Sequence, residues 1–205
     1  METKRLYYDD AYQRAFQARV VDQTAIDGQP AVALDRTCFF PASGGQPHDT
    51  GRLDEVAVVD VRQSNGRVWH LMQRPLEGQL VDGEILWPRR WDHMQNHSGQ
   101  HILSQAFIVA ADALTVAWRL SANSLTVDLD RPLSESDLAR AEQLANAVVQ
   151  ENRPIRARVV DEAELASLAL RKQPQVDGRL RSVEIADFDR VACSGTHVSS
   201  TAQVG

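Results

Sequence analysis

Cysteine is nearly absent from this 205-residue sequence, which contains only Cys38 and Cys193. Two cysteines exclude a disulfide-stabilised scaffold and favour a reducing cytosol. Apolar runs of the roughly 20 residues needed to cross a bilayer are also missing, which excludes a membrane-spanning helix. The N-terminus, METKRLYYDDAYQR, lacks the basic start and apolar core of a signal peptide. We therefore expect a cytoplasmic protein that does not enter the membrane.

Lysine is equally scarce, because 20 of the 22 basic residues are arginine and only Lys4 and Lys172 are lysine. The net charge of −6 argues against a protein that coats nucleic acid, since such affinity comes from neutralising many phosphates. Local arginine groups can still contact phosphate, although a solvated surface role is the more common one for any single arginine. The groups we predict for phosphate contact are Arg89 and Arg90; Arg153, Arg156 and Arg158; and Arg171, Lys172, Arg179 and Arg181.

Hydrophobic residues make up 43% of the chain and charged residues 24%, as in soluble globular proteins.

The first ninety residues are predicted to form a small β-barrel. Asp27-Gly28 and Asn65-Gly66 are typical of tight turns between short strands. Many short strands at this spacing indicate a small barrel or sandwich. The predicted strands are Ala15–Val21, Ala31–Phe40, Val56–Arg62, Arg67–Met72 and Gln79–Leu86.

After Pro88 the pattern changes to alternating helices and strands. Asp92–Leu114 has the composition of a buried helix. Ser134 and Asp137 form a capping box that opens a second helix, which runs to about Gln150. Its predicted inner stripe is Leu138, Ala141, Leu144 and Val148. Further predicted elements are the strands Ser124–Asp130, Ile155–Val160 and Arg181–Ala186 and the helix Glu162–Leu170. The predicted class is α+β, with a β-barrel domain at residues 1–90 and an α+β domain at residues 91–205, in which a helix packs on an antiparallel sheet.

Histidine and cysteine fall into two matched spacings in the second half. His97 and His101 are four residues apart in a predicted helix, and Cys193 and His197 are four apart in a glycine-containing loop after a predicted strand. Helical residues at i and i+4 lie on one face, about 5–6 Å apart at Cβ, so two imidazoles there can reach one metal ion. Three imidazoles and one thiolate suit Zn²⁺, and the thiolate disfavours Mg²⁺ or Ca²⁺. The pattern predicts a zinc site formed by these four residues.

Either pair alone is weak evidence, because core histidines and buried cysteines are common. Four of the eight cysteine and histidine residues fall into the two spacings, which strengthens the combination. His93 lies on the same helix face one turn earlier, and we expect it to have a structural role or to contact a ligand. Ser98 occupies the position of the glutamate in HExxH metalloproteases, which disfavours peptide hydrolysis by that route.

A third segment, FFPASGGQPHDTG at residues 39–51, is rich in turn-forming residues. Gly44 and Gly45 permit close approach of the backbone to a ligand, and Gln46 offers both a donor and an acceptor. A plain turn between two strands explains Gly44, Gly45 and Pro47 equally well. From the residues alone, the turn is the preferred interpretation.

The segments FFPASGGQPHDTG, NHSGQHIL and VACSGTHV together resemble the glycine-rich segment and the HxxxH and CxxxH motifs of the alanyl-tRNA editing proteins. These form the free-standing AlaX group, which is related to the editing domain of alanyl-tRNA synthetase. The resemblance covers nearly the whole chain, and the motifs occur in family order. The histidine and cysteine motifs also resemble the editing domain of threonyl-tRNA synthetase, so the glycine-rich segment is what favours the alanine system.

The resemblance implies a cytosolic aminoacyl-tRNA deacylase that removes serine, or glycine, from mischarged tRNA specific for alanine. It implies Zn²⁺ held by His97, His101, Cys193 and His197. Larger AlaX members pair an N-terminal β-barrel with the editing domain, which matches the predicted boundary. No aminoacylation domain fits in 205 residues, so editing without a synthetase is expected. Family members usually continue beyond the position of Gly205, so a closing strand is expected to be missing.

The expected reaction is hydrolytic acyl transfer on an ester. A zinc-associated water is the expected nucleophile, and no side chain stands out as a base. Catalytic zinc normally keeps three protein ligands and a water, whereas four protein ligands describe a closed structural site. Two routes therefore stay open: one ligand is displaced or lies at longer range, or zinc positions the substrate while an unbound water attacks.

Discrimination between serine and alanine needs a buried partner for the serine hydroxyl, because that partner is left unpaired when alanine binds. Gln46 is the first candidate for this substrate-binding role and Thr196 the second. Two other functions fit the same residues. One is a zinc-stabilised tRNA-binding module without hydrolytic activity, and the other is a metal-dependent hydrolase of small esters or amides that needs no tRNA.

Overall fold

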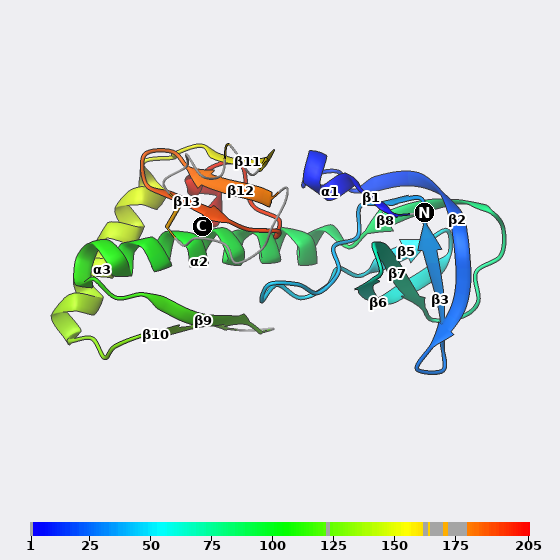
Figure 1. Cartoon of the computed structure of the whole chain (residues 1–205), viewed down its shortest axis with the longest axis horizontal. Helices are drawn as coiled ribbons and strands as arrows, with labels where there is room; N and C mark the ends of the chain where they lie inside the picture. Colours follow the sequence, from blue (N-terminus) through cyan, green and yellow to red (C-terminus); the bar gives the residue numbers. More distant parts are fainter. Residues whose placement is uncertain (1, 122–123, 162–163, 165–169, 172–179) are drawn as a thin grey trace. The chain divides into compact units, whose positions relative to one another are not determined.

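The computed structural model describes residues 2–121, 124–161, 164, 170–171 and 180–205 (Figure 1). This part of the chain is mixed α and β, with few helices and mostly antiparallel sheets, so the predicted α+β class is confirmed. The chain divides into two compact units, Met1–Asp92 and His93–Gly205. Of the described helices, none is long and apolar enough to cross a membrane.

The first unit consists mainly of strands that pair in the closed order β2-β3-β7-β6-β5-β8, with β8 returning to β2. Each neighbouring pair is antiparallel. Buried side chains fill the interior, among them Phe16, Phe39, Val61 and Met72. The bounds are β2 Ala15–Ile26, β3 Gln29–Leu34, β5 Gly51–Leu53, β6 Val56–Ser64, β7 Arg67–Met72 and β8 Leu80–Ile85. A parallel pair, β1 Lys4–Arg5 with β4 Arg36–Thr37, and a short helix, α1 Leu6–Asp9, complete the unit.

Two-residue turns join β2 to β3 and β6 to β7. Asp27 and Gly28 have φ of 52° and 79°, and Asn65 and Gly66 have φ of 50° and 77°. Positive φ at both central residues is the geometry of a type I′ turn, whose twist matches that of the flanking strands. Both predicted turns are therefore present.

The second unit is arranged around α2 Trp87–Ala111, which begins in the first unit. Figure 1 shows α2 running between a hairpin and a three-stranded antiparallel sheet. The hairpin packs on α2 through Phe107, Val127 and Leu129. The remaining bounds are β9 Thr115–Leu120 and β10 Leu125–Leu129 in the hairpin; α3 Glu135–Gln150; β11 Ile155–Val160, β12 Leu180–Ile185 and β13 Asp189–Ala192 in the sheet; and η1 Thr201–Val204.

Both ends of α2 differ from the prediction. The helix α2 starts at Trp87, five residues before the predicted Asp92, because Pro88 lies in the first turn, where its missing N–H needs no partner. It ends at Ala111 rather than Leu114, followed by Asp112 with φ of 50°. The strand β9 was not predicted at all. The predicted helix Glu162–Leu170 falls almost wholly outside the described residues.

The capping box predicted for α3 is present. The Asp137 backbone N–H donates to the Ser134 hydroxyl oxygen, and the Ser134 N–H donates to the Asp137 carboxylate. Ala141 and Val148 are buried, as predicted for the inner stripe. The prediction was wrong for Leu138, which is 47% exposed.

Candidate metal centre

Two histidines of the candidate site come from one face of α2. His97 and His101 are one helical turn apart, and their ring centroids lie 5.1 Å from each other. Both side chains are buried. Trp118 of β9 covers His97, with 4.6 Å between the ring centroids. The unpredicted strand therefore supplies one wall of the site.

The other two residues come from the loop that follows β13. The Cys193 backbone N–H donates to the carbonyl of Arg181 at 2.9 Å. In return, Nη1 of Arg181 donates to the carbonyls of Cys193 and Gly195, at 3.2 and 2.6 Å. The Gly195 N–H also points to the Cys193 sulfur at 3.3 Å. These contacts hold the loop against the start of β12.

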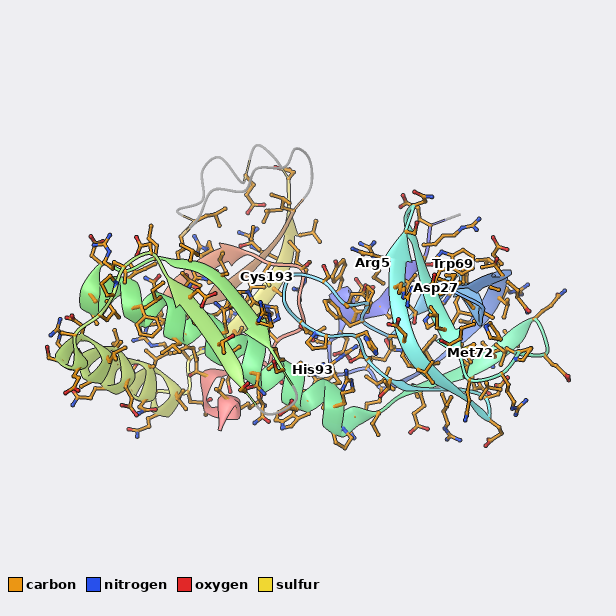
Figure 2. All side chains as sticks on the ribbon, turned by 90° about the horizontal axis from the view of Figure 1, so that it is seen from below. Arg5, Asp27, Trp69, Met72, His93 and Cys193 are labelled. Carbon is orange, nitrogen blue, oxygen red and sulfur yellow. The ribbon has the colours of Figure 1, made fainter. Side chains whose placement is uncertain are left out.

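The four predicted ligands lie together. One ligand atom from each of His97, His101, Cys193 and His197 falls within 4.8 Å of all the others. Sγ of Cys193 is 3.4 Å from Nε2 of His97 and 3.4 Å from Nε2 of His197. Figure 2 shows Cys193 beside α2. Of the described residues, these four form the group that could hold a metal ion, and His93 is not part of it.

The geometry fits a small tetrahedral ion. Bonds of about 2.0–2.1 Å to nitrogen and 2.3 Å to sulfur, at a tetrahedral angle, place the two atoms about 3.5 Å apart. The observed separations from Sγ of Cys193 to the two Nε2 atoms, 3.4 Å each, match this value. A thiolate with three imidazoles is also a donor set that zinc accepts readily.

The three imidazoles are neutral near neutral pH. Burial lowers the pKa of His97 to about 3, and the charges of Arg181 and His93 contribute to the shift. Burial likewise holds the pKa values of His101 and His197 well below their ordinary range. Neutral imidazole is the form that binds metal, so these rings need not lose a proton first. Burial raises the pKa of the Cys193 thiol, while the Gly195 N–H and Arg181 oppose the rise.

Polar side chains lie close to the Nδ1 atoms of two of the histidines. The hydroxyl oxygen of Ser98 is 3.1 Å from Nδ1 of His197 and accepts the Val198 N–H at 3.2 Å. The Asp189 carboxylate lies 3.8 Å from Nδ1 of His101. Burial raises the pKa of Asp189 to about 6, and Arg171 opposes this shift. Neither Ser98 nor Asp189 was predicted to support the site.

The two candidates for recognition of serine lie in different units. Thr196 belongs to the second unit; it lies between Cys193 and His197 in the sequence, and its side chain is buried. Gln46 is buried in the first unit, where its backbone bridges to Ser43. Gly44 and Gly45, at the centre of this turn, have φ of 56° and 88°. The turn that the residues favoured is therefore present, and the contact of either side chain with substrate stays a prediction.

The prediction of phosphate contact was wrong for Arg90. Its side chain is fully buried and forms an ion pair with Asp49, and it donates to the carbonyls of Cys38 and Ala11. Arg89 donates to the carbonyl of His48 at 2.9 Å.

The remaining predicted arginines are partly engaged within the second unit. Arg153 and Arg158 pair with Glu151 and Glu164. Arg181 holds the Cys193 loop, as described above, and Nη1 of Arg171 donates to the carbonyl of His101 at 3.4 Å. Of the predicted set, Lys172 and Arg179 lie outside the described residues, and Arg156 is exposed on β11.

The fold and the site together define an α+β protein with a candidate three-histidine, one-cysteine metal centre between a helix and a C-terminal loop. The chain is 34% identical to the alanyl-tRNA editing protein AlaX-L of Pyrococcus horikoshii over 98% of its own length and 52% of that protein. It is 34% identical to the alanine–tRNA ligase of Pyrococcus furiosus and 35% identical to that of Pyrococcus abyssi, over its full length and 24% of each ligase.

The chain is therefore a homologue of AlaX-L and of the matching part of the alanine–tRNA ligases, as the three motifs predicted. It spans about half the length of AlaX-L and about a quarter of the ligases. No protein-family model matches the chain.

Proposed function

We propose that this chain is a zinc-dependent hydrolase that removes a mischarged amino acid from tRNA specific for alanine. The observation that carries the proposal is the convergence of His97, His101, Cys193 and His197 in a homologue of proteins named for alanyl-tRNA editing and alanine–tRNA ligation. In this proposal the second unit is the editing domain, and the first unit is a β domain that contributes the glycine-rich segment.

Zn²⁺ is the ion that these donors fit best, and it would polarise the ester carbonyl and lower the pKa of a nearby water. The neighbouring side chains would hold the histidine rings in place. Ser98 and Asp189 lie near Nδ1 of two of the rings, and Trp118 packs against the third. Cys193 is the most exposed of the four ligands, whereas the three histidines are buried.

Recognition of serine needs a hydrogen-bonding group that alanine cannot satisfy. Thr196 lies in the same loop as two proposed ligands, so its hydroxyl is suited to contact the aminoacyl group. Gln46 is proposed as a second contact from the glycine-rich turn. An unsatisfied polar group in the complex with alanine would cost binding energy and would protect correctly charged tRNA.

The presence of four candidate donors favours one alternative function. Structural zinc sites have four protein ligands, whereas catalytic zinc keeps a position open. If all four residues bind the ion at once, the chain is better described as a zinc-stabilised tRNA-binding module. Displacement of one ligand by substrate or water would restore the hydrolytic function.

Hydrolysis assays on purified seryl-tRNA and alanyl-tRNA, both with tRNA specific for alanine, separate these functions. We expect release of serine, loss of release after chelation, and recovery after addition of Zn²⁺. Binding of tRNA without release of serine would support the binding module. Cleavage of small amino acid esters at the same rate as the tRNA ester would support a general esterase.

The two cysteines provide a matched pair of variants for this assay. Cys193→Ala should abolish release of serine and lower the zinc content of the purified protein. Cys38→Ala should change neither, because Cys38 is buried in the core of the first unit. Full activity in Cys193→Ala would contradict the proposed site.

A further inference from the structure

The strongest unexplained feature beside the candidate centre is a buried carboxylate that faces an imidazole. The Asp189 side chain is 1% exposed and that of His101 is 5% exposed. Oδ2 of Asp189 lies 3.8 Å from Nδ1 of His101, just beyond hydrogen-bond length. Among the described residues, neither Nδ1 of His101 nor either oxygen of Asp189 has a well-formed hydrogen bond. Two complementary polar groups therefore face each other in a buried place without a bond between them.

Burial of a carboxylate without hydrogen bonds costs free energy, so a buried carboxylate normally has a donor or a positive charge beside it. Arg171 supplies part of the compensation, with Nε 3.5 Å from Oδ1 of Asp189. Nη1 of Arg171 also donates to the backbone carbonyl of His101 at 3.4 Å. Arg171 thus contacts both Asp189 and the helix turn that carries His101, and it leaves Oδ2 directed at the imidazole.

The strand that carries Asp189 also leads into the metal loop. Asp189 is the first residue of β13 and pairs with Ile185 of β12, and the strand ends one residue before Cys193. One short strand therefore places both the proposed thiolate ligand and the carboxylate behind a second ligand. Movement of His101 by less than about 1 Å would close the gap to Asp189.

We propose that Asp189 is a positioning residue that accepts a hydrogen bond from Nδ1–H of His101 and so directs Nε2 of that ring to the metal. The inference rests on the proposed zinc site. A histidine ligand commonly donates its second N–H to a carboxylate, which fixes the tautomer and the ring orientation. Here Arg171 also holds the Asp189 carboxylate in place, so the acceptor of the proposed hydrogen bond from His101 has a fixed position.

The test measures metal affinity rather than turnover. Zn²⁺ affinity is measured by chelator competition for the full chain, for Asp189→Asn and for Asp189→Ala. We expect affinity to fall about 10- to 100-fold for Asp189→Ala, and less for Asp189→Asn, because the amide oxygen can still accept the bond. Glu184→Gln is the matched control, because it removes a carboxylate from neighbouring β12 that pairs with Arg190. It should leave the affinity unchanged.

Two further measurements separate positioning from general damage. The Co²⁺-substituted protein should show an altered visible spectrum in the Asp189 variants and an unchanged one in Glu184→Gln. The metal-free Asp189→Asn variant should keep the circular dichroism spectrum of the metal-free parent. Should the parent bind metal and both Asp189 variants bind it equally well, the role of Asp189 is refuted while the proposed function stands. Should the parent bind no metal, the proposed function itself fails.

Discussion

The Ser98 hydroxyl lies 3.1 Å from Nδ1 of His197 and links the helix that carries two proposed ligands to the loop that carries the other two. Ser98 is fully buried and also accepts the N–H of Val198. In HExxH proteases this helix position carries a glutamate that acts as a base. Here a short hydroxyl contacts the ring of a proposed metal ligand instead.

Replacement of Ser98 should therefore weaken metal binding. Ser98→Ala leaves Nδ1 of His197 without this partner, and we expect Zn²⁺ affinity to fall about 10-fold or more. Ser104→Ala is the control on the same helix, because Ser104 is also buried but bonds to Gln100 and Thr115. Chelator competition on the two variants checks this. Equal affinities would show that the hydroxyl does not orient the ring.

Removal of one partner from the buried Arg90–Asp49 pair should destabilise the protein strongly. Asp49→Ala leaves the guanidinium of Arg90 buried without its carboxylate, which typically costs about 3–5 kcal/mol. It also removes the acceptor of the Phe40 N–H. The control is Glu84→Gln, which breaks the exposed pair with Arg52 and should cost far less than Asp49→Ala. Denaturant unfolding gives both values, and similar losses would contradict the assignment.

Acid should destabilise the first unit through His70. Burial lowers the pKa of His70 from 6.5 to about 4, and its ring contacts Thr37 and the carbonyl of Val32. Between these pH values the unfolded chain binds a proton that the folded chain excludes. Stability is therefore complete above pH 6.5 and falls as the pH approaches 4, by about 3 kcal/mol from this residue.

His70→Gln tests this prediction, because glutamine can hydrogen-bond without titrating. The unfolding free energies of the metal-free parent and variant are compared from pH 7 to pH 4. The parent should lose more stability than the variant on acidification, while other histidines contribute equally to both. Parallel curves would mean that His70 titrates alike in the folded and unfolded chains.

Replacement of Gln46 should reduce the preference for serine without loss of metal. The loss of one hydrogen bond to the seryl hydroxyl costs about 1–3 kcal/mol of discrimination. We expect Gln46→Ala to hydrolyse seryl-tRNA more slowly relative to alanyl-tRNA, with unchanged zinc content. Gln17→Ala is the control in the same unit, because Gln17 is exposed and contacts Asp82. A preference unchanged in Gln46→Ala would leave the glycine-rich segment with the role of a turn alone.

The features that sequence predicted well depend on neighbours in the chain. The turn at Asn65-Gly66 and the cap formed by Ser134 and Asp137 each need only a few consecutive residues. The spacing of His97 and His101 also follows from helical geometry alone. The proximity of this pair to Cys193 and His197 could be predicted only because the four side chains together form a suitable set of ligands for one metal ion.

The features that sequence missed depend on residues distant in the chain. Arg90 follows another arginine and has the pattern of a surface residue. Its burial depends on the ion pair with Asp49 and on the carbonyls of Cys38 and Ala11, which are distant in the sequence. Asp189 lies in the strand β13, which ends just before Cys193. Its proximity to His101 depends on how β13 packs beside α2, which the local sequence does not show. The strand β9 is stabilised by pairing with β10, and its exposed Val116 obscures the alternating pattern.

The two donor pairs lie near opposite ends of the second unit's sequence, which has a consequence for biosynthesis. A nascent chain that has exposed only α2 carries two imidazoles and cannot complete a four-donor site. The other two donors lie in the loop after β13, which pairs with β12, so the four-donor site needs that part of the chain as well. Metal acquisition would then be coupled to completion of the fold, so a chain that stalls or misfolds would stay metal-free.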